Sequence, residues 1–576
     1  MRRLQTMVAV VFGLVMTVTA CGDDKTETAV VGVAPAGASV AALDNVFETI
    51  GTSFAVGEEV VFANGGRNDH NILPSNGDTS WGVAKDDFKP GDEYRHTFTE
   101  PGTYEYYCSI HGTDKVGMTG SLTVTGESSG AATTQVVVPV SEAAVVVSAP
   151  AVVPNDDGVI DVPEEVATIQ GAVDAAAPGD LVLIAPGIYH EAVNVTTDKL
   201  TIRGLDRNTV VLDGEFKLDN GVRVLGAKGV AVENMTAMNY TANGFFFTKA
   251  EGYRGSYLTA YRTGDYGVYA FDSVKGQIEH IYAAGSPDAG VYIGGCYPCD
   301  AVIDDVISEH NGLGYSGTNS GGNLLIINST FRNNRAGIVP NSGSYEPCYP
   351  ERETTIVGNL VYSNNQADTP AIDVALLAMG NGILSAGGVR NRIDRNLVYD
   401  HDKSGIGLVP FLEEDPNDDV PAPDTWATPC KTFRQRVPVK PEGAVLWDSL
   451  QTTVIDNVLS DNRVADLLVA SAGADPATFG HCFGDNTFST SLPLELQTLA
   501  PCEGKGTGSW KDGEYEILGW LGEEHPPSVD YKTANLPALV DQPNMPGALT
   551  DQAHPATDVP FAVDLAAIKV PTKPAA

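Results

Sequence analysis

The strongest constraint on the fold is a repeat of about 23 residues in the region after residue 159. A glycine, usually followed by an apolar residue, returns at Gly221, Gly244, Gly267, Gly290, Gly314 and Gly337. The same interval separates Gly382 from Gly405, and Gly443 from Asp466. Short alternating β runs on a fixed period predict one coil of a parallel β-solenoid per repeat, with each coil pairing to the next.

Residues from about 160 to 490 are similar to right-handed, single-stranded parallel β-helix proteins of the pectate lyase type, built from PbH1 repeats. The run VATIQGAVDAAAPGDLVLIAPGIYHEAVNV, residues 166–195, resembles the helix and first coil that cap many such domains. A weaker series of polar residues lies nine positions ahead of the repeat mark, at Asp305, Asn328, Asn396 and Asn457. The period breaks near 341–353, 366–379 and 409–440, where we expect loops to leave one rim.

A second motif lies in YYCSIHGTDKVGMTG, residues 106–120, between two predicted strands. Cys108 and His111 supply a thiolate and an imidazole from one turn, Met118 follows in the same loop, and His70 closes an earlier strand. A thiolate, two imidazoles and a weak axial thioether are the donors of type 1 copper. The alternative is a buried thiol, two surface histidines and a core methionine.

These four residues resemble the copper ligands of the plastocyanin and pseudoazurin group of cupredoxins. The resemblance implies a Greek-key β-sandwich that binds one copper ion through His70, Cys108, His111 and Met118, although the gap from His111 to Met118 is longer than in plastocyanin. We expect His96 to be a surface residue. No His-x-His pair occurs in the chain, which argues against a multicopper oxidase.

The predicted fold is all-β, a cupredoxin sandwich followed by the β-helix. The predicted organisation is a signal peptide at 1–21, a tether at 22–40, the sandwich at 41–126, an Ala, Val, Pro and Ser-rich linker at 127–158, the β-helix at 159–504 and a Pro-rich C-terminal cap or tail at 505–576. The net charge of -39, with no basic run downstream of the N-terminus, argues against nucleic acid as a partner.

The N-terminus combines Arg2 and Arg3 with an apolar run, 7–20, that is short for a membrane span but typical of an export signal. The run closes on Val-Thr-Ala-Cys21, which resembles the bacterial lipobox. The resemblance implies a lipid on Cys21 and a protein anchored to the cell membrane, on its periplasmic or extracellular face. The alternative is an ordinary signal peptide with an incidental cysteine.

An exported protein meets an oxidising compartment, so we expect the remaining cysteines to form disulfides. The candidates are Cys296, Cys299, Cys348, Cys430, Cys482 and Cys502, which allow fifteen pairings. A Cys482–Cys502 bond would lock the last coil, and a Cys348–Cys430 bond would tie two rim loops. The acidic loop 413–424 lacks the ladder of an EF-hand, so we expect a solvated loop without calcium.

The turns of the predicted β-helix carry a polar stripe that offers acid, base and cation groups for polysaccharide chemistry. Its weak catalytic candidates are Glu309, His310, Arg332, Asp400 and His401. The alternative is that solenoid turns are simply polar and that Glu309 and Arg332 form a surface ion pair. A second group of residues either offers sugar-stacking platforms or fills a sheet face: Tyr261, Tyr266, Tyr269 and Tyr292.

Three functions follow from these motifs. The first is one-electron transfer by an exported blue copper protein, with the β-helix as a rigid platform for a glycan or a partner; it requires an exposed edge of His111. The second is a polysaccharide lyase or epimerase with an accessory cupredoxin, and the third is copper delivery. The sequence identifies neither the redox partner nor a glycan ligand.

Overall fold

The computed structural model describes residues 39–49, 53–126, 158–435, 438–550, 552, 553, 556 and 562–574. Cys21 and nearly all of the predicted tether and linker lie outside these residues. The described residues fall in one compact unit, 31–576, and are mostly β-strand, which confirms the predicted all-β class.

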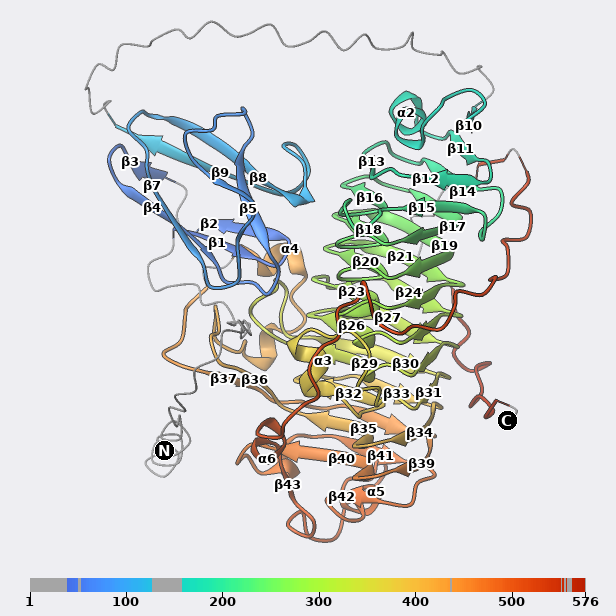
Figure 1. The fold of residues 1–576 in the computed structure, drawn as a ribbon. Helices are drawn as coiled ribbons and strands as arrows, with labels where there is room; N and C mark the ends of the chain where they lie inside the picture. Colours follow the sequence, from blue (N-terminus) through green and yellow to red (C-terminus); the bar gives the residue numbers. More distant parts are fainter. Residues whose placement is uncertain are drawn as a thin grey trace, which may run out of the picture. The chain divides into compact units, whose positions relative to one another are not determined.

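Residues 39–49 and 53–126 form the N-terminal sandwich, labelled β1 to β9 in Figure 1. One sheet has the order β2-β1-β4-β7 and the other β3-β9-β8-β5-β6. The strands are β1 (Val40–Leu43), β2 (Val46–Thr49), β3 (Ser53–Ala55), β4 (Glu59–Asn64), β5 (His70–Pro74), β6 (Val83–Phe88), β7 (Glu93–Thr97), β8 (Gly102–Gly112) and β9 (Gly117–Thr125). Phe47, Phe62, Trp81 and Tyr106 pack between the sheets. Because side chains alternate along a strand, Cys108 faces the same core as Tyr106, two residues earlier in β8.

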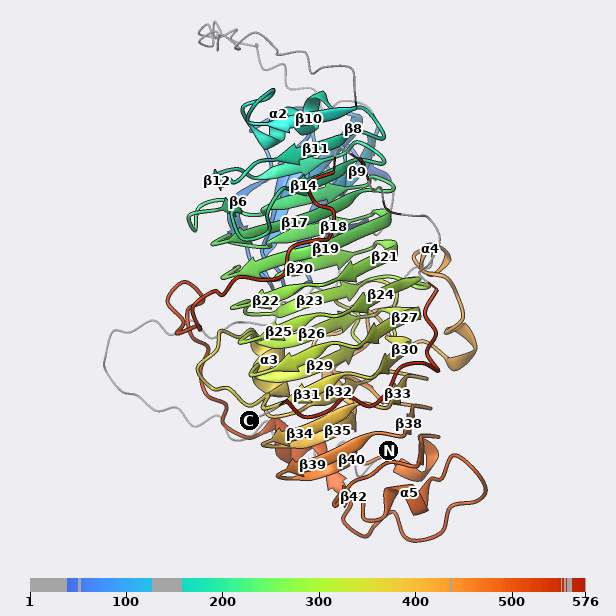
Figure 2. The same cartoon turned by 90° about the vertical axis from the view of Figure 1, so that its right-hand side faces the viewer.

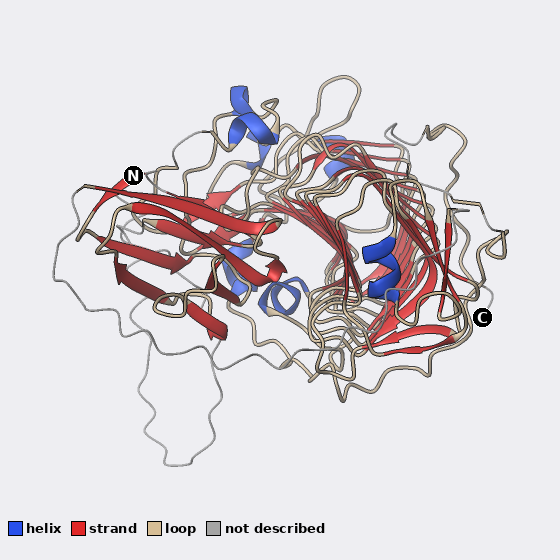
Figure 3. Ribbon diagram, turned by 90° about the horizontal axis from the view of Figure 1, so that it is seen from above, coloured by secondary structure: helices blue, strands red, loops and turns tan. Residues whose placement is uncertain are grey.

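The β-helix is built from three parallel ladders of strands, and Figure 3 shows strands of successive coils lying over one another. The first ladder contains β10 (Val159–Val162), β11 (Leu181–Ile184), β14 (Thr201–Gly204), β17 (Ala231–Met238), β19 (Glu251–Tyr261), β21 (Val274–Glu279), β24 (Ala301–Asp304), β27 (Gly321–Ile327), β30 (Arg352–Val357), β33 (Arg392–Asp394), β38 (Thr453–Ile455) and β41 (Cys482–Gly484). Strands β17 and β19 are long enough to take part in the second ladder too.

The second ladder adds β12 (Gly187–Tyr189), β15 (Val210–Asp213), β22 (Tyr282–Ala284), β25 (Ile307–Glu309), β28 (Thr330–Arg332), β31 (Leu360–Tyr362), β34 (Leu397–His401) and β39 (Val458–Asn462). The third contains β13 (Val193–Val195), β16 (Val222–Leu225), β18 (Phe245–Thr248), β20 (Val268–Phe271), β23 (Ala289–Gly294), β26 (Leu313–Thr318), β29 (Ala336–Asn341), β32 (Ile383–Ala386), β35 (Ser404–Val409), β40 (Ala465–Ser471) and β42 (Ser491–Leu492), with β43 (Tyr515–Glu516) paired to β40.

The register confirms that one repeat makes one coil. Phe245 pairs with Val268 and Val268 with Val291, each 23 residues further along the chain. The interval grows to 45 between Ile338 and Ile383, because the predicted breaks in the period insert extra chain there. Within the third ladder, Phe245 and Phe247 point into the coil and belong to its apolar core, while Phe246 between them belongs to a second cluster on the outer face.

Short helices cap the β-helix or lie in its insertions. They are α2 (Ile169–Ala175), α3 (Asp373–Ala378), α4 (Cys430–Phe433), α5 (Leu496–Leu499), α6 (Ile517–Leu521) and the 3-10 turns η1 (Pro423–Thr425) and η2 (Pro476–Thr478), beside the hairpin of β36 (Phe411–Glu413) and β37 (Val445–Trp447). Helix α2 begins where the sequence predicted a cap, because Thr168 accepts a hydrogen bond from the Gly171 amide at its N-terminus.

Asparagine side chains stack inside one corner of the coils. The amide of Ser329 donates to the side chain of Asn359, and the same bond links Asn359 to Asn396 and Asn396 to Asn457. Asp305 and Asn328, which the sequence grouped with Asn396 and Asn457, occupy the preceding turn position, where φ is positive (50° and 47°). In these two coils the residues equivalent to Asn396 and Asn457 are Val306 and Ser329, so the grouping was wrong by one residue for Asp305 and Asn328.

The described residues of the C-terminal segment, 505–550, 552, 553, 556 and 562–574, run along the outside of the β-helix, in dark red in Figure 2. Arginines of the coils hold its backbone carbonyls. Arg335 donates to Pro526 and Pro527, Arg262 to Tyr531 and Ala534, Arg207 to Pro543, and Arg395 to Ile568. These bonds fasten the segment to the β-helix at several points along its length.

Three disulfides staple the β-helix, joining Cys296 to Cys299, Cys348 to Cys430 and Cys482 to Cys502. The Cys348–Cys430 bond joins two insertions, and the Cys482–Cys502 bond ties the last coil to the chain after α5. Disulfides persist in oxidising compartments, so they support an exported protein. None of the helices in the described part of the chain is long and apolar enough to cross a membrane.

Candidate metal centre

The four predicted copper ligands come from three neighbouring strands of one sheet. His70 begins β5, Cys108 and His111 lie near the end of strand β8, and Met118 is the second residue of β9. Strand β8 pairs with both β5 and β9, which brings the three segments together. All four side chains are buried, and Met118 packs in the same core cluster as Cys108.

The donor atoms of three of these residues converge. The Nδ1 atoms of His70 and His111 lie 3.1 Å apart, and the Cys108 sulfur lies 3.8 Å from the first and 3.6 Å from the second. Among the described residues, this is the one group of three or more His, Cys, Asp or Glu side chains whose donors approach this closely. A buried thiol facing two imidazole nitrogens provides the soft, trigonal donor set that copper prefers.

Asn71 fixes the two halves of the centre relative to each other, and sequence reasoning missed it. Its side-chain amide donates to the Ser109 hydroxyl at 2.9 Å and accepts from the Ser109 backbone amide at 2.8 Å. Because Asn71 follows His70 and Ser109 follows Cys108, these bonds hold the imidazole and thiol segments in register. Second-shell bonds of this kind orient metal ligands.

The hairpin that carries Met118 depends on two glycines. Gly112 pairs with Gly117 across the β8–β9 turn, and a Cβ on Gly117 would lie 2.6 Å from the Cα of Gly112. Gly117 also has a φ of 91°, which favours glycine. Glycine at both positions lets the loop close tightly enough to place Met118 beside Cys108.

Burial sets the protonation of the ligands. It lowers the pKa of His70 to about 3 and holds the pKa of His111 well below its usual range, so both imidazoles are neutral. Burial also raises the pKa of the Cys108 thiol. A metal ion binds neutral imidazole and thiolate, so copper binding at this site displaces one proton, from sulfur.

The structure contradicts one expectation about the histidines. His111 is only 3% exposed, so the exposed imidazole edge that was expected for electron transfer is absent, and an electron would reach the centre through the atoms that cover this ring. His96 is half-buried against Trp81 and Phe98, and it lies outside the ligand group, as expected. Burial of His111 could not be predicted because Arg223, more than a hundred residues away, holds the neighbouring loop.

The fold and the donor set define a copper-binding cupredoxin joined to a β-helix. Residues 37–125 match the family of copper binding proteins described as the plastocyanin/azurin family, and residues 243–410 match the right handed beta helix region. Through residues 37–125, the chain belongs to the plastocyanin/azurin family. Its cofactor is copper, held by His70, Cys108, His111 and Met118 as in a type 1 site.

Several plastocyanins are similar to this chain in sequence. The chain is 38% identical to plastocyanin of Lactuca sativa over 88 residues, which are 14% of this chain and 87% of that protein. It is 35% identical to plastocyanin of Sambucus nigra over 92 residues, covering 14% and 91% of the two chains. The likeness is therefore confined to the N-terminal sandwich.

Solved structures resemble the β-helix in fold. The A-module of mannuronan C-5 epimerase AlgE4 from Azotobacter vinelandii has a TM-score of 0.36 at 16% identity, covering 61% of this chain and 96% of that one. A rhamnogalacturonan lyase has a TM-score of 0.38 at 10% identity, covering 64% and 92%. At these values the likeness carries no conclusion about activity.

The predicted polar stripe does not form one site. Glu309 accepts from Arg332 at 2.6 Å and from the Tyr282 hydroxyl at 2.9 Å, and Arg332 also donates to Tyr362. His401 instead points into the coil, where it contacts the side chains of Asn364 and Asn462.

The other two candidates of the stripe have a left-handed backbone, Asp400 within β34 and His310 directly after β25, with φ of 62° and 58°. Asp400 accepts from the Ser363 hydroxyl at 2.5 Å, and His310 is half-buried with its pKa lowered by burial. The five candidates thus divide between an ion pair, two positions of left-handed backbone and the interior of the coil.

The candidate tyrosines fill sheet faces rather than offering platforms. Tyr266, Tyr269 and Tyr292 are buried; the rings of Tyr266 and Tyr269 stack with centroids 4.2 Å apart, and the Tyr292 ring packs at a steep angle against both. Their hydroxyls contact Asp288, Asn45 and Glu346, respectively. Tyr261 is also buried and donates to the carbonyl of Pro537 in the C-terminal segment.

The acidic loop 413–424 is not fully solvated, contrary to expectation. Glu413 is buried and accepts from the Ser344 amide and hydroxyl and from the Trp447 indole. Asp418 is buried as well and accepts from the Tyr349 hydroxyl. Protein donors satisfy both carboxylates, so these two residues hold the loop against the rim.

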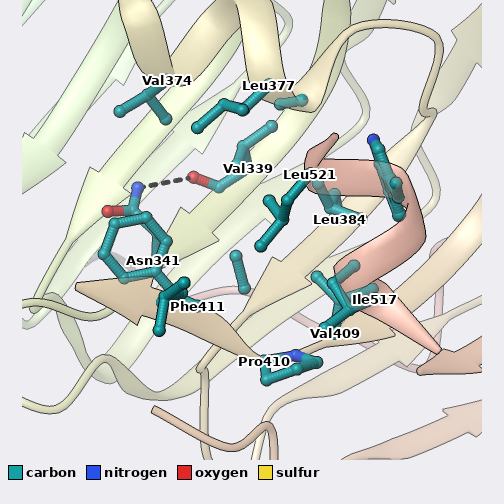
Figure 4. A pocket seen from close by; sticks show the side chains of 14 residues that line it. Val339, Asn341, Val374, Leu377, Leu384, Val409, Pro410, Phe411, Ile517 and Leu521 are labelled. Carbon is teal, nitrogen blue, oxygen red and sulfur yellow. Dashed lines mark hydrogen bonds between the residues drawn. The ribbon is translucent and has the colours of Figure 1, made fainter. Parts of the chain in front are cut away.

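One pocket lies between the third ladder and the helices α3 and α6 (Figure 4). Its walls are apolar, formed by side chains that include Val339, Leu384, Phe411 and Ile517. Two polar side chains contribute to the lining: the amide of Asn341 donates to the Val339 carbonyl, and the indole Nε1 of Trp520 has no hydrogen-bond partner. One unpaired donor among apolar walls is too little to orient a sugar or an ion.

Proposed function

We propose that the protein is an exported, lipid-anchored blue copper protein that transfers single electrons, with the β-helix as its rigid platform. The observation that carries the proposal is the convergence of the Cys108 sulfur and the Nδ1 atoms of His70 and His111 in a buried sandwich core. Copper in such a site supplies a one-electron couple, Cu(II)/Cu(I).

The protein's own contribution is to keep the donors fixed. His70 and His111 stay neutral because they are buried, and Asn71 locks the segments that carry His70 and Cys108. Met118 is buried in the same core cluster as Cys108, in a hairpin that closes tightly at Gly112 and Gly117. A centre that barely rearranges between oxidation states needs little reorganisation energy, and this suits electron transfer better than release of the metal to an acceptor.

The anchoring part of the proposal comes from the sequence. The residues before Cys21 resemble a lipobox, and the three disulfides support an oxidising compartment. A lipid on Cys21 would hold the protein at the cell membrane, on its periplasmic or extracellular face. Mass spectrometry of the membrane fraction, compared with a Cys21→Ala variant, tests this; a soluble wild-type protein without the lipid mass would contradict it.

An optical redox titration of the copper-loaded full chain tests electron transfer. We expect one reversible couple with the slope of a one-electron process, identical in the oxidative and reductive directions. Incubation with a Cu(I) chelator at matched concentration serves as the control against delivery. An irreversible titration, or rapid loss of copper to the chelator, would overturn the electron-transfer proposal.

A further inference from the structure

The β-helix holds the loop that carries the copper ligands, residues 108–118, hereafter the copper loop. Arg223 lies in β16, and its Nη1 donates to the backbone carbonyls of Ser109 at 2.9 Å and Ile110 at 2.8 Å. These two residues are the ones between Cys108 and His111. The guanidinium is oriented from the other side, because its Nε donates to the Asn194 side chain at 2.8 Å.

A second cation contacts the other end of the copper loop. The Nζ of Lys249, next to β18, donates at 2.6 Å to the carbonyl of Gly117, which precedes Met118. Gly226 permits this approach, since a Cβ at that position would lie 2.7 Å from a methyl group of Val116. Two positively charged side chains of the β-helix thus donate hydrogen bonds to the copper loop, one between Cys108 and His111 and the other directly before Met118.

The charges of these two side chains are only partly offset by acids: Asp219 acts on Arg223, and Asp272, which is paired with Arg434, acts on Lys249. Arg223 is 7% exposed and Lys249 is half-buried. Their hydrogen bonds to the copper loop go to neutral carbonyl oxygens, which leave the net charge in place. In a buried setting a charge acts over longer distances than in water, because the effective dielectric constant is lower.

We propose that Arg223 and Lys249 raise the reduction potential of the copper centre through their positive charges. The oxidised centre carries one more positive charge than the reduced one, so two adjacent cations disfavour the oxidised form. The electron that reduces the centre comes from the external redox partner, and no proton moves with it. This inference rests on the proposed electron-transfer function and assigns the β-helix a role in tuning it.

The test is the midpoint potential of full-length, copper-loaded variants. We expect Arg223→Gln and Lys249→Gln each to shift the oxidation equilibrium about tenfold toward Cu(II), which lowers the potential by ~60 mV. Arg223→Lys keeps the positive charge, so its midpoint potential should stay close to that of the wild-type protein. Arg463→Gln removes the same charge at a side chain that is 72% exposed and paired only loosely with Asp402, and it should leave the potential unchanged.

Hydrogen exchange of the copper-free protein distinguishes an electrostatic effect on the potential from a loss of structure in the copper loop. If Arg223 acts by charge, exchange in residues 109–112 should be similar in the Gln and Lys variants while their potentials differ. Equal potentials for these two variants, or an unchanged potential in Arg223→Gln with the visible copper band intact, would overturn the inference and leave the proposed function standing. A wild-type protein that binds no copper would instead overturn the proposed function.

Discussion

The copper centre of the sandwich and the Arg335 cluster of the β-helix both bury polar side chains, yet these side chains are satisfied in different ways. In the sandwich, the Nδ1 atoms of His70 and His111 face each other and a thiol, and the Nε2 of His70 has no partner. In the β-helix, buried Arg335 donates to four backbone carbonyls, at Ala367, Thr369, Pro526 and Pro527. Buried donors that converge without ordinary partners mark the functional centre, whereas saturated ones hold the scaffold together.

The largest effect should come from breaking a saturated cluster in the β-helix. Arg352 is fully buried, stacks 3.6 Å above the Tyr297 ring and donates to the carbonyls of Cys348, Pro350, Trp426 and Thr428. Arg352→Met leaves these acceptors unpaired, so we expect the free energy of unfolding to fall by about 3 kcal/mol or more. Denaturant unfolding of the full chain measures this loss.

The matched control is Arg463→Gln, which removes an arginine from the β-helix surface. Its ion pair with Asp402 spans 3.8 Å and is solvent-exposed, so we expect a change within about 0.5 kcal/mol. If both variants lost the same free energy of unfolding, buried arginines with many carbonyl partners would contribute no more to stability than exposed ones, contrary to the prediction.

The next effect concerns pH, and it arises where the two regions meet. The Asp44 amide donates to the Tyr345 carbonyl, and the Arg67 guanidinium lies 3.7 Å above the Tyr345 ring. Burial raises the pKa of Asp44 to about 6 and that of Asp288 to about 7, and it holds the pKa of Glu346 well above its usual range. These carboxyls bind protons more tightly in the folded protein than in the unfolded chain.

Stability from these carboxyls should therefore be fully present below the unfolded pKa of 3.8 and be lost as pH rises through about 6 to 7. We expect the thermal midpoint to fall across this window. Asp288→Asn, which mimics the neutral form, should flatten the profile, while exposed Asp402→Asn should not. A midpoint that rises from pH 4 to pH 7, or an unchanged slope in Asp288→Asn, would contradict this assignment.

A smaller effect should follow from loosening the copper centre without touching a ligand. Asn71→Ala removes both bonds to Ser109 and leaves the Ser109 amide unpaired. We expect a loss of about 1–2 kcal/mol in stability and a ~10-fold or greater weakening of copper retention. Competition with a chelator measures retention; Asn76→Ala, at an exposed turn of the same domain, is the control and should match the wild-type protein.

The smallest effect should come from the polar stripe. Glu309→Gln removes a partly exposed ion pair with Arg332 while an amide oxygen can still accept from Tyr282. We expect at most about 1 kcal/mol of destabilisation and no change in the copper spectrum. Release of unsaturated sugars from a polyuronate by the wild-type protein, and its loss in Glu309→Gln, would show instead that the stripe is catalytic.

The sequence predicted what depends on local spacing. The 23-residue interval fixes the coil register, as in the pairing of Phe245 with Val268, and the types and order of Cys108, His111 and Met118 identify copper. The sequence did not predict features that depend on contacts between residues far apart in the chain. His111 is buried beside a loop that Arg223 holds from more than a hundred residues away, and Glu413 is buried by Ser344 and Trp447.

The most direct test of the account is the visible absorption spectrum of the purified, copper-loaded full chain beside that of Cys108→Ser. A thiolate bound to Cu(II) in a trigonal site gives an intense charge-transfer band in the red part of the spectrum. We predict a blue wild-type protein and a variant without the band, even where the variant retains some copper. A colourless wild-type protein, or a band that persists in Cys108→Ser, would contradict the central claim that Cys108 is a ligand of type 1 copper.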